Sequence, residues 1–161
     1  MKMGVSFMSY DEKFMKKALS LAKKAYALDE VPVGAVIVKD GEIVSSGYNK
    51  REKSNDATAH AEINAIKKAC RKLNDFRLIG CDIYVSLEPC VMCMGAILNA
   101  RLENVYFGAY ISNGSISAEE LCLRAELNHK TGIFGGYMKD ECSGLISSYF
   151  KEKRKKKKEK Y

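Results

Sequence analysis

The spacing of apolar side chains near the start of the chain is typical of an amphipathic helix. Apolar residues recur every three or four positions there, with lysines between them. These apolar residues are Phe14, Ala18, Leu21, Ala25 and Leu28. Just before them, Ser9 and Glu12 have the spacing of a capping box, in which a serine caps the helix and a glutamate reaches back. The pattern predicts a first helix over residues 10–28, with Ser9 as its cap.

Short apolar runs then alternate with further helical patterns. The Asp40-Gly41 dipeptide between two such runs predicts a β-hairpin. Strands are expected over residues 31–38, from 43 onward, and over 83–87, 105–107 and 131–134. Helices are expected over residues 59–72, from the paired cysteines to 100, over 118–127 and from 138 to the end, with a polar loop at 48–58. This alternation predicts an α/β protein, a three-layer α/β/α arrangement around a mixed five-stranded sheet.

Length and composition limit the classes of protein that need to be considered. With 161 residues, 47% of them hydrophobic, we expect one globular domain with a good core. The apolar runs fall short of the roughly 20 residues that a membrane span needs. The N-terminal apolar segment is too short for a signal peptide. We therefore expect a cytoplasmic protein that does not bind a membrane. Four of its six cysteines are expected to be buried thiols rather than disulfides, and these are Cys70, Cys81, Cys122 and Cys142.

The net charge of +7 is concentrated at the C-terminal end. Residues 151–160 contain eight basic and two acidic side chains, whereas the rest of the chain is nearly neutral. We expect a globular domain over residues 9–150 and a basic tail over 151–161, whose central lysines are Lys155, Lys156, Lys157 and Lys158. Such a run is consistent with an arm for a polyanion such as RNA, and equally with the solvated end of the last helix.

Two short motifs carry the candidate chemistry. The segments His60-Ala61-Glu62 and Pro89-Cys90-Val91-Met92-Cys93 match H-x-E followed by P-C-x-x-C, which is the signature of zinc deaminases. One imidazole and two thiolates leave the fourth position of a tetrahedral zinc ion open for water. Bound zinc lowers the pKa of that water to roughly 7, so hydroxide is available at neutral pH. Glu62 is expected to carry protons as the general base and acid.

The spacing of these residues predicts where the helices begin. Cys90 and Cys93 are three positions apart, so a first helical turn places their side chains side by side, and Pro89 suits the start of that helix. His60 and Glu62 are two positions apart and would not face each other in mid-helix, so a helix is expected to begin near His60. Asp56 and Thr58 stand just before it as candidate capping groups. Both halves of the site are thus expected at helix N-termini, behind the C-terminal ends of strands.

Other interpretations of the motifs remain open at this point. A Cys-x-x-Cys pair alone could be a redox pair or half of a structural zinc site. A closed structural site needs four protein ligands, and His129 could supply the fourth. That interpretation leaves Glu62 without a role.

Beyond these motifs, the chain resembles the bacterial tRNA-specific adenosine deaminases, a family with the cytidine-deaminase-like fold. The resemblance covers residues 9–150. It is carried by Glu30-Val31-Pro32-Val33-Gly34-Ala35, Gly47-Tyr48-Asn49, Thr58-Ala59-His60-Ala61-Glu62-Ile63, the stretch 84–93, Phe107-Gly108-Ala109, Asn128-His129 and Ser148-Tyr149-Phe150. It implies hydrolytic deamination of the wobble adenosine of an arginine tRNA to inosine, by a homodimer.

The resemblance also implies roles for individual residues. His60, Cys90 and Cys93 would bind zinc, and Glu62 would shuttle the proton. The substrate would be held by Asn49, which would hydrogen-bond the flipped nucleoside, and by the pocket around Val33, Ala61 and Pro89. Without the resemblance, Asn49 would be interpreted as a turn residue.

The chain departs from the family pattern in places that bear on the substrate. Ala57 stands where the family usually has proline. Tyr110 and Ile111 replace a polar residue and an aspartate that would contact ribose. The same chemistry on free guanine, cytosine, a nucleoside or single-stranded DNA is therefore an alternative. A second alternative, motivated by the basic tail, is a non-catalytic RNA-binding partner that zinc stabilises.

Overall fold

One mixed sheet organises the protein, whose computed structural model describes residues 10–111, 116–124 and 129–160. The strands are β1 (Gly34–Lys39), β2 (Glu42–Tyr48), β3 (Cys81–Leu87), β4 (Asn104–Ala109) and β5 (Gly132–Phe134). Their order is β2-β1-β3-β4-β5. The pairings β1–β2 and β1–β3 are antiparallel, and β3–β4 and β4–β5 are parallel. The expected five-stranded mixed sheet is therefore confirmed.

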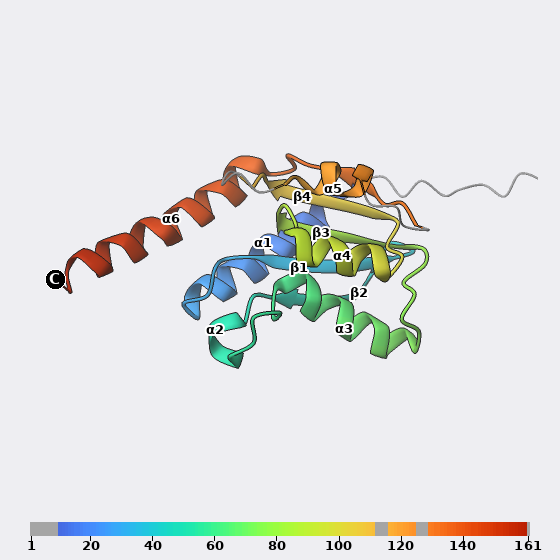
Figure 1. The fold of residues 1–161 in the computed structure, drawn as a ribbon, viewed down its shortest axis with the longest axis horizontal. Coiled ribbons are helices and arrows are strands. Elements are labelled where there is room, and N and C mark those ends of the chain that lie inside the picture. Colours follow the sequence, from blue (N-terminus) through green and yellow to red (C-terminus); the bar gives the residue numbers. More distant parts are fainter. Residues whose placement is uncertain (1–9, 112–115, 125–128, 161) are drawn as a thin grey trace, which may run out of the picture.

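Helices cover both faces of this sheet (Figure 1). They are α1 (Glu12–Ala27), α2 (Arg51–Ser54), α3 (Ala61–Leu73), α4 (Val91–Asn99), α5 (Ala118–Arg124) and α6 (Lys139–Lys158). One face packs against α1 and the start of α6, and the other against α3 and α4. This is the expected three-layer arrangement. No helix in the described ranges is both long and apolar enough to cross a membrane.

The alternation of side chains along β1 divides the core in two. Ala35 and Ile37 are buried on the face shared with α3 and α4, whereas Val36 and Val38 are buried against Phe14 of α1. Successive side chains of a strand point to opposite faces, so a strand covered on both faces reads as a continuous apolar run. That is why residues 34–38 carry no polar side chain.

A glycine sets the distance between β2 and the start of α3. A Cβ atom added to Gly47 would lie 2.5 Å from the carbonyl oxygen of Ala61 and 2.8 Å from the amide nitrogen of Ala65. A larger residue would push the first turn of α3 away from the sheet. Gly47 therefore positions the helix end that carries the first half of the candidate site.

The start of α1 differs from the prediction. The N-cap is Asp11, whose side chain accepts a hydrogen bond from the Lys13 amide at 3.1 Å, and the helix begins at Glu12. The predicted cap, Ser9, lies outside the described residues. The Asp11 amide also donates to the Tyr84 hydroxyl at 3.0 Å. This contact with a distant strand fixes the entry to the helix and favours Asp11 as the cap.

Two further boundaries were predicted wrongly. The polar segment 48–58 is not all loop, because it contains the single-turn helix α2. The first strand starts at Gly34 rather than at residue 31, since the Val33 amide donates to the Val31 carbonyl in a tight turn at 2.9 Å. The helix expected over 118–127 is observed to Arg124, and the rest of that prediction, 125–127, falls outside the described residues. The six cysteines are free thiols.

Candidate metal centre and substrate pocket

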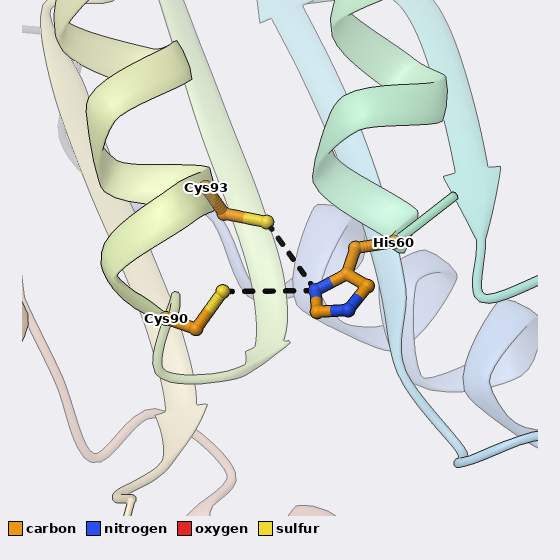
Figure 2. Close-up of side chains that lie close together, drawn as sticks. All are labelled: His60, Cys90 and Cys93. Atoms are coloured by element: carbon orange, nitrogen blue, oxygen red, sulfur yellow. Dashed lines mark hydrogen bonds between the residues drawn. The ribbon is translucent and has the colours of Figure 1, made fainter. Parts of the chain in front are cut away.

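Two helix N-termini meet at the carboxyl end of β3. His60 is the N-cap of α3 and Cys90 is the N-cap of α4, both with extended backbones at ψ 157° and 173°. Cys93 follows in the first turn of α4. Figure 2 shows both sulfur atoms pointing toward the His60 ring from one side. The prediction that both motifs lie at helix N-termini is confirmed.

The three side chains have the spacing of a tetrahedral metal site. The Sγ atoms of Cys90 and Cys93 each lie 3.6 Å from His60 Nδ1, and all three candidate ligand atoms lie within 4.8 Å of one another. Zinc–sulfur bonds of about 2.3 Å and zinc–nitrogen bonds of about 2.0–2.1 Å at a tetrahedral angle separate nitrogen from sulfur by about 3.5 Å. The observed distances therefore fit zinc, and three ligands leave its fourth position open.

The protein surroundings favour a thiolate at this site. Hydrogen bonds from the Cys93 thiol and His60 lower the pKa of Cys90 to about 4. The same sharing raises the pKa of Cys93, whose thiol donates to Cys90, and burial adds to the effect. The N-terminus of α4 also favours negative charge. Without a metal ion, only one of the two cysteines is readily deprotonated. A bound cation removes this competition, because a metal ligates both cysteines as thiolates.

Glu62 lies beside the ligands in the first turn of α3, with 3% of its surface exposed. Burial raises the pKa of its carboxyl group to about 7. A general acid and base works best when its pKa lies near the working pH, because it can then both take and return a proton. The position and the burial of Glu62 therefore suit a proton shuttle next to the metal centre.

The metal centre forms the floor of a pocket of about 140 Å³. Pockets for drug-sized ligands measure roughly 300–1,000 Å³, so this one suits a single planar base. Its lining residues are Val31, Val33, Asn49, Arg51, His60, Glu62, Leu87, Glu88, Cys90 and Ile111. Four of these residues are aliphatic, Glu62 and Glu88 are acidic, and Arg51 is basic.

Asn49 is held in the pocket wall by two hydrogen bonds. Its Nδ2 donates to the Val31 carbonyl at 3.3 Å, and its Oδ1 accepts from the Arg51 amide at 3.2 Å. Each of these atoms retains capacity for a further hydrogen bond. Asn49 is 6% exposed, so its orientation is fixed before a ligand arrives. Asn49 thus offers the pocket an oriented donor and acceptor for a base or sugar.

Two buried carboxylates that the sequence analysis did not single out hold the rim of this pocket. Glu30, fully buried, accepts from the Glu52 and Lys53 amides of α2 at 3.1 and 2.7 Å. Glu88, 4% exposed, accepts from the Ile111 and Ala118 amides at 3.0 and 2.9 Å. Both lie in segments that carry the family resemblance, but the sequence does not indicate which amides they bind.

The other candidate residues have different surroundings. Ala61 and Pro89 are buried and stand between pocket-lining residues in the chain, Ala61 between His60 and Glu62 and Pro89 between Glu88 and Cys90. Asp56 does not cap α3, because its side chain accepts from the amide and hydroxyl of Thr58 instead. His129 hydrogen-bonds the Leu102 carbonyl at 2.8 Å, and the cluster of candidate ligand atoms found among the described residues does not include it.

Comparisons with known proteins agree with this geometry. A family model for the cytidine and deoxycytidylate deaminase zinc-binding region matches residues 8–109. The tRNA-specific adenosine deaminase of Bacillus subtilis (strain 168) is 44% identical over 153 residues, which span 94% of this chain and 95% of that protein. The residues that the family model matches include both motifs of the metal centre.

Solved structures give the same result. One, from a study of A-to-I editing by tRNA:A34 deaminases at the wobble position of transfer RNA, has a TM-score of 0.80 at 39% identity and covers 84% of this chain and 99% of that one. The X-ray structure of guanine deaminase from Bacillus subtilis has a TM-score of 0.60 at 46% identity, covering 63% of this chain and 66% of that one. The chain therefore belongs to the cytidine and deoxycytidylate deaminase zinc-binding family.

Proposed function

We propose that this protein is a zinc-dependent hydrolytic deaminase that converts the wobble adenosine of a tRNA to inosine. The observation that carries the proposal is the three-ligand metal centre beside a buried glutamate, at the floor of a pocket the size of one base. The similarity over nearly the whole length of a tRNA-specific adenosine deaminase supports the choice of substrate.

Within this proposal, His60, Cys90 and Cys93 hold the zinc ion. When bound, zinc supplies a Lewis acid that makes water nucleophilic near neutral pH. Glu62 takes a proton from the attacking water and returns it to the amino group that leaves C6 of adenine as ammonia. The products are inosine and ammonia, so the overall reaction consumes one water and needs no other reactant.

The remaining residues of the pocket orient the base. Asn49 is placed to donate or accept one further hydrogen bond to the nucleoside, and Val33 forms the apolar wall. The pocket admits one base, so the target nucleotide has to be turned out of its stack to enter. Single-stranded loop RNA meets this requirement at lower energetic cost than a duplex does.

We further propose that the substrate is an arginine tRNA and that the protein acts in the cytoplasm as a homodimer. Val91 and Met92, in the first turn of α4 beside the ligands, are 51% and 36% exposed. Exposed apolar residues at the edge of the site are suited to contact with a second copy. Measurement of the mass in solution tests the dimer directly.

Deamination of free guanine is a second candidate function. The similarity to a guanine deaminase supports it. Ile111 also supports it. This apolar side chain lines the pocket where the tRNA-specific adenosine deaminases usually have an aspartate that would contact ribose, and a free base has no ribose to hold. The two candidates share the metal centre and differ in whether RNA outside the pocket contributes to binding.

The test uses an arginine tRNA transcript with adenosine at the wobble position. Zinc-loaded protein and the Glu62→Gln variant are compared, and inosine is detected because sequencing reads it as guanosine. Conversion at that one position by the parent alone supports the proposal. Turnover of free guanine or a nucleoside without tRNA conversion would establish the second candidate. Bound zinc with no turnover of any of these substrates would favour a non-catalytic, zinc-stabilised RNA-binding partner.

A further inference from the structure

The last helix extends beyond the globular body and carries most of the protein's excess charge. Helix α6 has 20 residues and runs past the sheet toward the side of the molecule where α2 lies (Figure 1). Its final turns include residues 151–158, and we call residues 151–160 the basic arm. This arm contains eight basic and two acidic side chains, all but Lys153 exposed. The predicted tail lysines, Lys155 to Lys158, are thus part of a helix.

The base of the arm is attached to the body at the turn after α1. The buried Tyr149 donates its hydroxyl proton to the Asp29 carbonyl at 3.2 Å, and its ring packs edge-on against Tyr26 at 5.7 Å. Lys153 forms an ion pair with the Asp29 carboxylate at 2.7 Å. An exposed ion pair contributes little by itself, but together with the buried tyrosine it sets the direction in which the arm leaves the body.

The same turn leads directly into the substrate pocket. Asp29 is followed by Glu30, which holds α2, and by Val31, which lines the pocket. On the far side of this turn, Arg51 lines the pocket edge and Lys53 is exposed on α2. The turn that anchors the arm at Asp29 therefore continues, within two residues, into the segment that holds α2 and lines the pocket.

The arm presents two faces of different character. Lys153, Lys156 and Lys157 lie around hollows shared with Asp29, and the two glutamates of the arm also line these hollows. The opposite face carries basic residues at positions i, i+3, i+4 and i+7, which align along one side of a helix. We call this set the outer stripe, and it consists of Lys151, Arg154, Lys155 and Lys158.

The dimensions of the outer stripe match a nucleic-acid backbone. Seven residues of helix span about 10 Å at a rise of 1.5 Å per residue. Successive phosphates of one strand advance by about 3.4 Å, so the stripe can face about three of them. We propose that the outer stripe binds the phosphates of the RNA whose flipped base occupies the pocket. This inference rests on the proposed function, because it assumes a base that remains attached to its RNA.

The proposal predicts a specific salt dependence. Each lost phosphate contact lowers the slope of log affinity against log salt by about 0.7–0.9. Loss of two contacts makes the ratio of variant to parent KM roughly tenfold larger at 50 mM than at 200 mM salt. The kcat at saturating tRNA stays the same, since the arm contacts neither zinc nor the reacting atoms.

The experiment compares two variants with the same change in net charge. The first replaces the outer stripe by glutamine, which has a similar helix propensity and leaves the contacts to Asp29 in place. The matched control replaces four exposed basic residues on α3 by glutamine. These residues are Lys67, Lys68, Arg71 and Lys72. KM and kcat for the tRNA are measured at both salt concentrations, and binding of an anticodon stem-loop is measured by fluorescence anisotropy.

The expected result is weaker binding and a shallower salt dependence for the outer-stripe variant only. Equal effects in the two variants, or none in either, overturn the proposal while leaving inosine formation by the parent intact. Absence of inosine formation by the parent contradicts the proposed function instead, and the anisotropy measurement still tests the stripe. Phosphatidylserine vesicles that bind the parent but not the outer-stripe variant, with RNA binding unchanged in both, would assign the stripe to a membrane surface and also overturn the proposal.

Discussion

Replacement of Glu88 by glutamine tests whether this buried carboxylate holds the rim of the substrate pocket in place. Glu88 lies two residues before the ligand Cys90 and is nearly fully buried. One carboxylate oxygen accepts from the Ile111 amide and the other from the Ala118 amide. Glutamine keeps only one of these acceptors. Its NH₂ group then faces a backbone N–H, so one buried donor loses its partner.

The size of the effect follows from the two hydrogen bonds. A hydrogen bond to a charged group contributes about 1.5–3 kcal/mol, and a buried donor left without a partner costs about 1–3 kcal/mol. We expect the free energy of unfolding to fall by about 1–3 kcal/mol. For a chain of this size, each kcal/mol corresponds to a decrease in Tm of about 2–4 °C. Because Ile111 lines the pocket, its displacement should raise KM more than it lowers kcat.

The assay combines thermal unfolding, zinc content and steady-state kinetics. Ser117→Ala is the control, because it removes a hydrogen bond from the Glu120 amide at the start of α5 and leaves the contacts of Glu88 intact. Loss of such a cap costs about 1 kcal/mol, so its stability loss should be comparable. The reasoning is refuted if Glu88→Gln loses stability with an unchanged KM, or if both variants raise KM equally.

Three further outcomes are expected. Glu62→Gln should keep its fold and zinc but lose about 10²–10⁴-fold in kcat, and a loss below about tenfold would contradict the proton-shuttle assignment. Gly47→Ala should lower both Tm and zinc retention, because the added Cβ would press on α3. The control is Gly144→Ala, at an exposed helical position, which should raise the free energy of unfolding by about 0.5–1 kcal/mol in the same thermal measurement. Cys93→Ser should lose zinc to a chelator faster than the parent, as metal analysis after dialysis will show.

The metal centre could be predicted from the sequence because its geometry is local. Cys90 and Cys93 are brought together by a single helical turn, and His60 needed only a helix that begins directly after it. Both conditions depend on neighbouring residues. The β1 run and the Asp40-Gly41 hairpin were equally accessible, since a continuous apolar segment and a turn dipeptide each have one favoured structure.

The errors arose where distant contacts decide between local options. Ser9 and Asp11 are both good N-cap residues. The contact that favours Asp11 joins its amide to Tyr84, which is 73 positions away in the sequence. The helix α2 has only four residues, too few to show a periodic pattern. It forms where the carboxylate of Glu30 binds its first amides, and that partner is 22 positions distant.

Glu30 and Glu88 explain why the substrate is harder to predict than the reaction. Each of the two carboxylates accepts hydrogen bonds from backbone amides rather than from particular side chains. The residue types in the sequence therefore do not reveal these contacts. Yet these contacts place α2 with Arg51 on one side of the pocket and Ile111 on the other. We therefore infer that the metal centre sets the chemistry and that the two anchored rim segments select what enters the pocket. On this inference, substrate preference is changed by substitutions in those segments, while His60, Cys90 and Cys93 stay the same.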